Sequence, residues 1–449
     1  MSQSTPPVEP LDANLLVYGK VLTMDAEETV IEDGAVAVAG DTIVAVGEHC
    51  ALTARFPEAR QLGLPHGLVM PGLVNTHTHA AMSCFRGLAD DLPLMTWLTD
   101  YIFPAEAQLN EEIVYQSSLL SCAEMIRSGT TSFCDMYLFA PAVARATVEA
   151  GMRGWIGEVL YDFPSPSYGE LENGFALLEE LFAQYRHHQL ITITVDPHAV
   201  YTCSPELLAR LKAVAERHDA AYVIHLSETK DEVASCVERY GLRPVEHLER
   251  LGLLDSRVVA NHCVELSEEE IELLARRGVR VAHCPESNMK LASGVAPVVE
   301  LLAGGVAVGL GTDGAASRND VDLFGEMDTC AKVHKVHRLD PTVMGARTVL
   351  SMATTGGAAV LGASGEIGSL EPGKKADLIV LDLDQPHLTP LYNIPSHLVY
   401  AARGSDVCHS VINGQVVMQN RRLLTMDEEA LLAQMNQLGR KIASLIRKR

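Results

Sequence analysis

The feature that most constrains the fold is an alternation of strand-like and helical runs through the middle of the chain. Eight short apolar or alternating runs follow one another, and amphipathic stretches separate them. These runs cover residues 67–79, 130–137, 153–161, 190–199, 221–228, 257–266, 280–288 and 306–314. Eight alternating units predict an α/β fold with a parallel sheet and outer helices, most simply a (β/α)8 TIM barrel. A doubly wound open sheet is the alternative, and it is disfavoured because no GxGxxG or Walker loop follows the first run.

Helix-start signals locate several of the intervening helices. Ser204 and Pro205 occupy the N-cap and first helical positions of a stretch that ends at residue 218. Ser267 and Glu270 have capping-box spacing at the head of another. We therefore expect helices over residues 109–128, 204–218 and 267–277.

The two ends of the chain have the pattern of short strands. Residues 15–47 contain apolar runs around a Gly40-Asp41 turn, and residues 376–383 form another apolar run. Asn413-Gly414 lies between two further apolar runs, which is a strong hairpin signal. The domain boundaries predicted from this pattern are residues 1–66 and 366–425 for a small β-sandwich, 67–365 for the barrel and 426–449 for a C-terminal helix.

Composition restricts the partners. The chain has 35 Lys and Arg against 58 Asp and Glu, a formal net charge of −23, which repels nucleic acid and anionic lipid. Residues 1–10 lack the pattern of a secretory signal, and no apolar run reaches 18 residues, so we expect no membrane segment. Ten cysteines without a CxxC pair suit a reducing compartment. We expect a cytoplasmic protein that binds a small neutral or cationic molecule.

Polar residues gather where the predicted strands end. In a barrel, the carboxyl ends of all strands open onto one face, where active sites are built. One histidine at a strand end is more often a structural hydrogen-bonding group, but the convergence of eight such residues predicts a site. They are His77, His79, His198, His225, Glu228, His262, His283 and Asp313.

Four of these residues have the chemistry of a metal site. His77 and His79 are two apart in a strand, so their side chains point the same way. With His225 and Asp313 they would supply three nitrogens and one oxygen, a ligand set that suits Zn²⁺. A remaining position would hold water, whose pKa the metal lowers towards neutrality.

Three further residues are candidates for the chemistry around that water. Glu228, three residues after His225, could take its proton, and the alternative is a glutamate at a helix N-terminus. His262 could polarise the water or stabilise developing negative charge. His283 could orient the rim of the site.

The sequence around these residues resembles the 5′-methylthioadenosine/S-adenosylhomocysteine deaminases of the amidohydrolase superfamily. The resemblance covers nearly the whole chain, and the ordered set HxH, HxxE, H and D is specific for the superfamily. The segments that carry it are PGLVNTHTHAAMSCFRGLADDLPLMTWL, HLSET, NHCVEL, HCPESNMKLASG, GTDGAAS and GSLEPGKKADLIVLDLD.

The resemblance implies hydrolytic deamination of an adenosine-like nucleoside. It assigns His77, His79, His225 and Asp313 to one divalent metal ion, Zn²⁺ being favoured. Binuclear relatives often carry a carboxylated lysine near the end of the fourth strand; here that segment is DPHAVY, without lysine. In this family a metal-bound hydroxide attacks C6 of adenine, and His262 and Asp313 would hold its oxygen. Glu228 would protonate purine N1 and help ammonia leave.

Substrate contacts follow from the same resemblance. His198 would contact the purine, and Glu106 would hold the ribose hydroxyls. The alternative for Glu106 is an exposed glutamate at a helix start. Trp97 would line the pocket or belong to the core.

One departure concerns the 5′ substituent. Relatives that use S-adenosylhomocysteine well can carry arginines after the third strand, whereas residues 158–174 here contain four carboxylates and no arginine. The departure favours 5′-methylthioadenosine or adenosine over S-adenosylhomocysteine, although Arg318, after the eighth run, is another source of a cation.

Two other functions remain open at this point. One is a guanine or triazine deaminase or chlorohydrolase on the same scaffold; dechlorinating relatives tend to lack the glutamate found here as Glu228. The other is a catalytically inactive barrel that acts as an interaction protein, which usually loses its metal ligands. The resemblance also leaves open a homo-oligomer.

Overall fold

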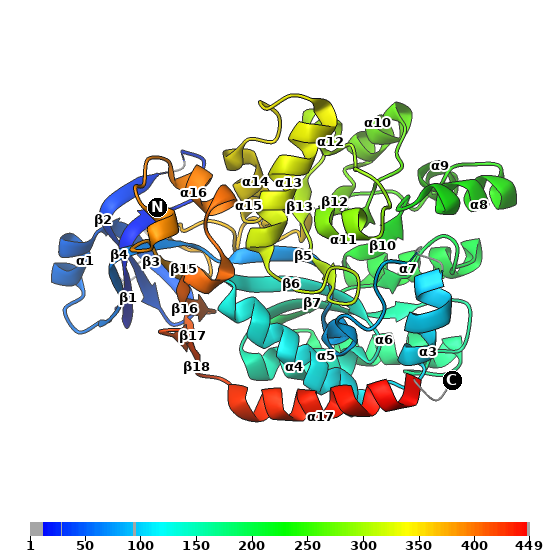
Figure 1. Cartoon of the computed structure of the whole chain (residues 1–449), viewed down its shortest axis with the longest axis horizontal. Helices are drawn as coiled ribbons and strands as arrows, with labels where there is room; N and C mark the ends of the chain where they lie inside the picture. The colour runs from blue at the N-terminus through cyan, green and yellow to red at the C-terminus, as the bar shows by residue number, and fades with distance from the viewer. Residues whose placement is uncertain (1–11, 28, 93–95, 447–449) are drawn as a thin grey trace, which may run out of the picture.

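The computed structural model describes residues 12–27, 29–92 and 96–446, so residues 1–10, where no secretory signal was expected, lie outside it. Parallel strands in two sheets occupy its centre, with helices around them (Figure 1). The first sheet has the order β14-β5-β6-β7-β8, with β9 paired to β7, and the second has the order β10-β11-β12-β13. The strands are β5 (Leu73–His79), β6 (Thr130–Tyr137), β7 (Arg153–Leu160), β8 (Ile191–Ile193), β9 (Asp196–Pro197), β10 (Tyr222–Leu226), β11 (Val258–His262), β12 (Arg280–His283), β13 (Val308–Leu310) and β14 (Asp313–Gly314).

The two sheets adjoin at both of their ends. Parallel bridges join Val195 to Tyr222 and Ala199 to His225, which links the β8–β9 segment to β10. At the other end the chain passes from β13 into β14, which pairs with β5. Every residue of β6 and β7 is buried, as expected for parallel strands covered on both faces. The predicted α/β architecture with parallel strands is confirmed.

Helices separate these strands along the chain. Ser204 caps α7, where its hydroxyl accepts from the backbone N–H of Leu207, and the capping box of Ser267 and Glu270 begins α10, both as predicted. The helix expected over residues 109–128 is α4. The helices are α4 (Glu111–Arg127), α5 (Ala140–Ala150), α6 (Leu171–Tyr185), α7 (Pro205–His218), α8 (Lys230–Tyr240), α9 (Pro244–Arg250), α10 (Glu268–Arg277), α11 (Pro285–Lys290), α12 (Val298–Ala303), α13 (Leu323–Arg338), α14 (Ala346–Met352), α15 (Thr355–Val360) and α16 (Ile394–Tyr400).

Two of the predicted strand-like runs each contain parts of two secondary-structure elements. The run 67–79 contains the end of β4 (Arg60–Pro71) as well as β5. Gly72 separates the strands, and a Cβ atom there would lie 2.1 Å from the Thr131 side chain, so the chain turns where only glycine fits. The run 280–288 ends as strand β12 at His283, because Pro285 starts α11.

Strands from both ends of the chain form one mixed sheet with the order β18-β17-β16-β15-β4-β1-β2-β3. The Gly40 turn and the Asn413-Gly414 hairpin are confirmed, and their φ angles of 62°, 51° and 73° are left-handed. The remaining strands are β1 (Leu15–Leu22), β2 (Val30–Ala39), β3 (Thr42–Glu48), β15 (Leu378–Asp382), β16 (Val407–Ile412), β17 (Gln415–Gln419) and β18 (Arg422–Leu423); helix α1 (His49–Arg55) follows β3. The two-layer sandwich stays a prediction.

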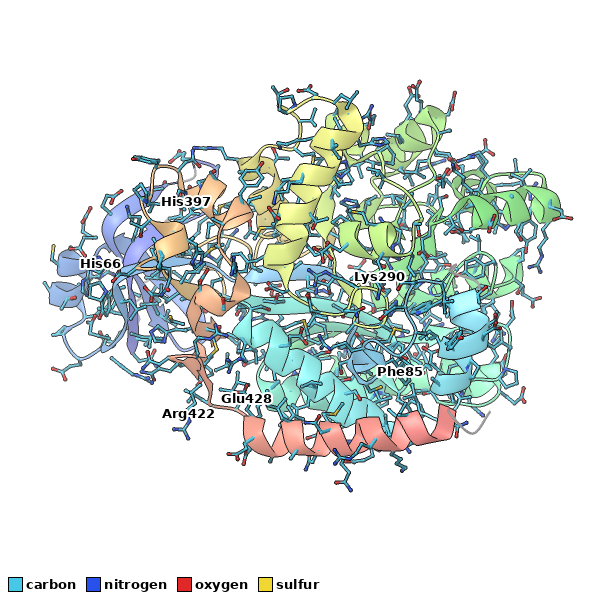
Figure 2. All side chains as sticks on the ribbon, in the orientation of Figure 1. His66, Phe85, Lys290, His397, Arg422 and Glu428 are labelled. Atoms are coloured by element: carbon cyan, nitrogen blue, oxygen red, sulfur yellow. The ribbon has the colours of Figure 1, made fainter. Side chains whose placement is uncertain are left out.

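The last helix, α17 (Glu428–Ile446), lies along α4 (Figure 1). Glu428, labelled at its start in Figure 2, accepts two hydrogen bonds from the Arg127 guanidinium at the end of α4. All ten cysteines are free thiols. No helix in the described part of the chain is long and apolar enough to cross a membrane.

Candidate active site

The predicted metal ligands come from β5, β10 and β14, and their side chains lie close together. Nε2 of His79 is 3.1 Å from Oδ1 of Asp313, and Nε2 of His77 is 3.6 Å from the same oxygen. The ring centroid of His77 lies 4.8 Å from that of His79 and 5.0 Å from that of His225. The structure therefore brings three imidazoles and one carboxylate to a single point.

Backbone carbonyls orient two of these imidazoles. Nδ1 of His79 lies 2.5 Å from the carbonyl oxygen of Met136, and Nδ1 of His225 lies 2.8 Å from that of His198. Because a carbonyl oxygen only accepts, each Nδ1 carries a proton, and Nε2 is the ring nitrogen that can bind a metal.

His77 gives the clearest test of whether these residues fit a metal. Its side chain is fully buried, and neither ring nitrogen has a hydrogen-bond partner within the described residues. Burial, followed by the neighbouring His79, holds the pKa of His77 well below its usual range, so the ring is neutral. A buried polar group without a partner costs roughly 1–3 kcal/mol, and a cation beside Nε2 removes that cost. The donor set of three imidazole nitrogens and one carboxylate fits Zn²⁺, whose binding displaces a proton from a protonated ligand nitrogen.

The contact between His79 and Asp313 shifts the pKa values of both side chains. Burial alone lowers the pKa of His79, but the hydrogen bond and charge of Asp313 outweigh it and raise that pKa to about 9. Burial likewise raises the pKa of Asp313, and the bond to His79 holds it well below its usual range. The carboxylate thus stays ionised and available as an anionic ligand.

The second carboxylate oxygen of Asp313 is fixed by two hydroxyls. Ser287 Oγ donates to Oδ2 at 2.6 Å and Ser317 Oγ at 2.8 Å, which leaves Oδ1 to face the imidazoles. The backbone of Asp313 is left-handed, with φ 59°, as is that of His262, with φ 69°. Such conformations cost energy and cluster at functional sites.

Glu228 lies just before α8 in the same cavity as the metal ligands. Its side chain is buried, and burial raises the pKa of its carboxyl group. The helix cap is Thr229, and the carboxylate that accepts from the backbone of the turn is that of Glu232, which bonds the N–H groups of Ser227 and Glu228. The alternative of a glutamate serving the helix N-terminus therefore describes Glu232 better than Glu228.

His262 is buried at the end of β11 and lies within the metal cluster. One of its ring nitrogens is within 4.8 Å of ligand atoms of His77 and Asp313. Its Nδ1 lies 2.9 Å from the side-chain oxygen of Asn288. Because that oxygen accepts, Nδ1 is protonated and Nε2 is the nitrogen that can serve the site.

The predicted substrate residues line this cavity. Nδ1 of His198 is 2.9 Å from the Thr202 hydroxyl, and burial lowers the pKa of His198 to about 3, so its ring is neutral. Trp97 begins the π-helix η2 (Trp97–Ile102), where it is both buried in the core and part of the cavity wall. Its indole N–H donates to the carbonyl of Ala89 at 3.1 Å.

Glu106 ends the short helix α3 (Phe103–Glu106) and is partly buried in the cavity lining, so the alternative of an exposed glutamate is wrong. The hydroxyl of Tyr137 donates to its Oε1 at 2.8 Å. Burial raises the pKa of the Glu106 carboxyl group to about 7. The group therefore lies in the cavity wall with one oxygen already oriented.

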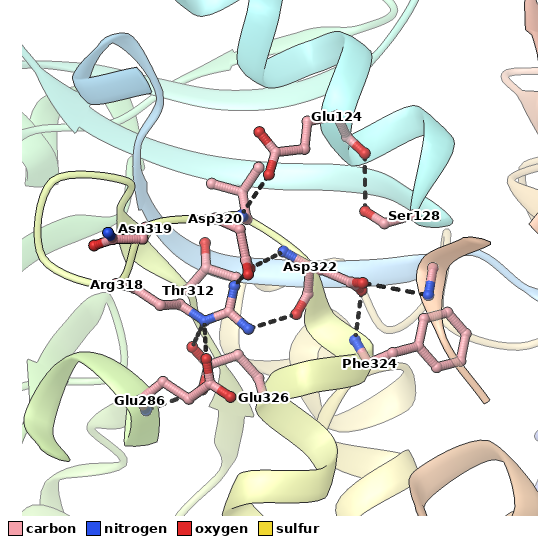
Figure 3. A network of polar contacts seen from close by, with 12 residues as sticks. Glu124, Ser128, Glu286, Thr312, Arg318, Asn319, Asp320, Asp322, Phe324 and Glu326 are labelled. Carbon is pink, nitrogen blue, oxygen red and sulfur yellow. Dashed lines mark hydrogen bonds and ion pairs between the residues drawn. The ribbon is translucent and has the colours of Figure 1, made fainter. Parts of the chain in front are cut away.

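Two residues lie elsewhere than expected. Nε2 of His283 is 3.1 Å from Nε2 of His334 on α13, away from the cavity lining. Arg318 is enclosed by carboxylates, with its Nε 2.8 Å from Glu286 and 2.6 Å from Glu326 (Figure 3). It is therefore not the free cation that the sequence suggested for this cavity.

Sequence reasoning missed the residues that hold the catalytic groups. Ser287, Ser317 and Asn288 contact Asp313 or His262, and Tyr137 contacts Glu106. Tyr137 ends β6, so its place at the carboxyl end of a strand was the available signal. Ser287 and Asn288 lie in the short helix α11 after β12, and Ser317 lies in the turn after β14, where sequence spacing alone does not show which way a side chain points.

Comparison with known proteins agrees with this geometry. A protein of Syntrophobacter fumaroxidans named 5-methylthioadenosine/S-adenosylhomocysteine deaminase is 58% identical over 428 residues, covering 95% of this chain and 98% of that protein. A 5′-deoxyadenosine deaminase of Methanosarcina barkeri is 46% identical over 414 residues, covering 92% of this chain and 94% of that protein.

A solved structure has the same fold. The crystal structure of an adenosine deaminase from Xanthomonas campestris with bound zinc matches with a TM-score of 0.95 and 42% identity, covering 97% of this chain and 100% of that one. The model of the amidohydrolase family matches residues 68–417. With its metal-ligand cluster, its fold and these matches over most of its length, the chain belongs to the amidohydrolase family.

Proposed function

We propose that this protein is a metal-dependent hydrolase that deaminates adenosine-like nucleosides, giving the inosine analogue and ammonia. One observation carries the proposal: a single cavity contains the imidazole–carboxylate cluster, a buried carboxyl group at Glu228 and a partly buried one at Glu106. The names of the relatives, which are deaminases of adenosine derivatives, support the same reaction.

His77, His79, His225 and Asp313 would hold one divalent cation, Zn²⁺ fitting best. When bound, the cation acidifies a coordinated water and so supplies the attacking nucleophile. No lysine from the described residues lines the cavity, so no carboxylated lysine is at hand to bridge a second metal there.

Glu228 would move the protons. Attack of water oxygen on purine C6 pushes electrons onto N1, which must be protonated for the C6–N1 double bond to open. A carboxyl group whose pKa burial raises can give its proton to N1 and then take the two protons of the attacking water in turn. It passes one of them to the departing amino group and keeps the other, which restores the protonated carboxyl group. The product is the C6 oxo purine with ammonia released.

Three other residues would orient the reactants. His262, protonated on Nδ1, presents Nε2 to the attacking oxygen beside Asp313. Neutral His198 would contact the purine, and Trp97 would form part of the wall. Glu106 would accept hydrogen bonds from the ribose hydroxyls, with Tyr137 holding the carboxyl group in place.

The cavity wall favours an apolar 5′ substituent. Among the described residues no lysine or arginine lines the cavity, and its ionised and ionisable acids are Glu106, Glu228 and Asp313. The rings of Tyr161 and Phe163 stack at 4.0 Å in its wall. An aromatic surface without a cation suits a methylthio group better than the charged amino-acid tail of S-adenosylhomocysteine.

Ammonia release from a panel of compounds tests the proposal. We expect turnover of 5′-methylthioadenosine and adenosine, and little with guanine or with chloro- or aminotriazines. Turnover confined to guanine or triazines would establish the alternative hydrolase. A folded protein with neither bound metal nor activity would instead indicate an interaction protein.

We also propose the domain boundaries that the sequence pattern predicts. We place a (β/α)8 barrel in residues 67–365, a β-sandwich in residues 1–66 and 366–425, and a terminal helical segment in residues 426–449. Free thiols support a cytoplasmic location. Homo-oligomer formation stays a prediction from the resemblance.

A further inference from the structure

Helix α11 contacts two catalytic groups through adjacent residues. Ser287 donates to Asp313 at 2.6 Å, and the next residue, Asn288, accepts from His262 at 2.9 Å. Both side chains are almost completely buried, with exposures of 0% and 1%. One short helix thus reaches the metal carboxylate and the imidazole that faces it.

The two contacts differ in what they determine. The Ser287 hydroxyl occupies Oδ2 of Asp313, which leaves Oδ1 directed at His77 and His79. The Asn288 oxygen selects the His262 tautomer with the proton on Nδ1. Loss of the first contact would loosen a metal ligand, whereas loss of the second would free the ring to rotate or to change tautomer.

The charged side chains of Glu286, Arg318 and Glu326 form a network that connects α11 with α13 (Figure 3). Glu286, which precedes Ser287, forms an ion pair with Arg318 at 2.8 Å and accepts from the Thr329 hydroxyl of α13 at 2.6 Å. Its backbone N–H donates to Glu326, which also pairs with Arg318. The Arg318 and Glu326 side chains are 1% and 0% exposed, whereas that of Glu286 is 29% exposed, so the Arg318–Glu326 pair is the buried part of the network.

We propose that α11 is the positioning element of the active site, in which Ser287 fixes Asp313 for metal binding, Asn288 fixes His262 for catalysis and the Arg318–Glu286–Glu326 network fixes the helix. Ser287, Asn288 and Arg318 would be positioning residues, since they act through the groups that they hold. Figure 3 shows Glu286 and Glu326 side by side at the Nε of Arg318. Arg318 is not among the residues that line the substrate cavity.

The role of Asn288 is tested by enzyme kinetics. This test rests on the proposed function. With 5′-methylthioadenosine as substrate, Asn288→Ala should lower kcat about 100-fold with KM and zinc content unchanged. Asn288→Asp, which keeps an accepting oxygen at the same place, should recover most of that loss. A kcat of Asn288→Ala within twofold of the unaltered protein would overturn the assignment, as would equal losses in the two variants. If Asn288→Ala does not fold, Asn288→Asp against unaltered protein decides.

Ser287 is tested without any activity measurement. Competition with a chelator should show that Ser287→Ala binds zinc about 10- to 100-fold more weakly. Asn288→Ala, which removes a contact to His262 and not to Asp313, should keep the zinc affinity of the unaltered protein, and this separates the two variants. Unchanged zinc affinity would overturn the Ser287 assignment. This arm remains valid even if no nucleoside is deaminated, so the two proposals can fail independently.

The role of the Arg318–Glu286–Glu326 network is tested with two variants of α11. Glu286→Ala should weaken zinc binding and lower kcat together, because it releases both contacts. Met289→Ala is the matched control: Met289 lies on α11 but is 51% exposed, so both quantities should stay unchanged. Equal behaviour of the Glu286 and Met289 variants would contradict the role of the network.

Discussion

His79 and Asp313 face each other across the join between β5 and β14, with Nε2 of the imidazole 3.1 Å from Oδ1 of the carboxylate. Thr78, beside His79, is the register partner of Asp313 in this strand pair. The contact therefore connects the first strand of the parallel system with its last. A cation held between these side chains links the same two strands, so metal binding and fold stability should be coupled.

Metal removal should reveal that coupling. Dialysis against a chelator is expected to abolish deamination and lower the melting temperature, and added Zn²⁺ should restore both. Zinc at 100 times its Kd would stabilise the protein by about 2.7 kcal/mol. Calorimetry with and without zinc measures this, and His77→Ala serves as the control that should not respond. An unchanged melting temperature after verified metal loss would contradict the coupling.

Glu228→Gln should keep the shape of the site and lose the proton carrier. We expect kcat to fall by about 10²- to 10⁴-fold, the usual contribution of general acid–base catalysis. Metal content by elemental analysis should match that of the unaltered enzyme, because Glu228 is not among the ligands. Glu232→Gln offers a comparison, since Glu232 bonds the turn and would affect stability before catalysis. Near-normal kcat in the Glu228 variant would exclude it as the proton carrier.

The aromatic wall makes a prediction about substrates. kcat/KM should be higher for 5′-methylthioadenosine than for S-adenosylhomocysteine, since no cation faces the carboxylate of the latter. Phe163 is 44% exposed at this wall, so Phe163→Arg can place a guanidinium there without entering the core. The variant should gain about tenfold on S-adenosylhomocysteine relative to 5′-methylthioadenosine, because a charge-assisted hydrogen bond contributes ~1.5–3 kcal/mol. Phe163→Leu is the uncharged control.

Arg318→Met should be strongly destabilising. It removes the cation that contacts Glu286 and Glu326 and leaves both carboxyl groups without it, and removing one partner of a buried pair costs about 3–5 kcal/mol. Burial raises the pKa of Glu326 to about 8 in spite of Arg318. Denaturant titration measures the loss, and the double variant Arg318→Met with Glu326→Gln should recover part of it. Equal stability of the Arg318 variant and unaltered protein would show that the pairs contribute nothing.

The raised pKa of Glu158 predicts that the free energy of unfolding depends on pH. Burial raises its pKa from 4.5 to about 7, so the folded state keeps a proton that the unfolded state releases above pH 4.5. The folded state binds more protons in this window, so stability should fall as pH rises from 4.5 to 7, by at most about 3 kcal/mol. Glu158→Gln should flatten this slope in melting experiments between pH 5 and 8. An identical slope would show that Glu158 ionises at its ordinary pKa.

The parts of this molecule that sequence predicted are those determined by local pattern. His77 and His79 are placed together by strand periodicity alone, and Ser204 and Ser267 cap their helices through side chains within three residues. The convergence of His225 and Asp313 on the same point followed from the rule that parallel strands end at one face.

The parts that sequence did not predict depend on packing between distant segments. The sequence left Arg318 open as a cation for the 5′ substituent, but its guanidinium contacts Glu286 and Glu326, partners that no local pattern reveals. Asn288 and Ser287 point to different strands although they are neighbours, since helical geometry turns successive side chains apart. The strand boundary at Gly72 was missed because the adjoining apolar runs have no polar residue between them.

Strand β4 pairs with β1 on one edge and with β15 on the other. During synthesis, β15 emerges about 300 residues after β4, a delay of roughly 15–60 s at typical translation rates. Throughout that interval the Leu68–Met70 edge has main-chain groups without their final partner, and such edges invite pairing with other chains. The nascent polypeptide should thus depend on chaperones until its last third has left the ribosome.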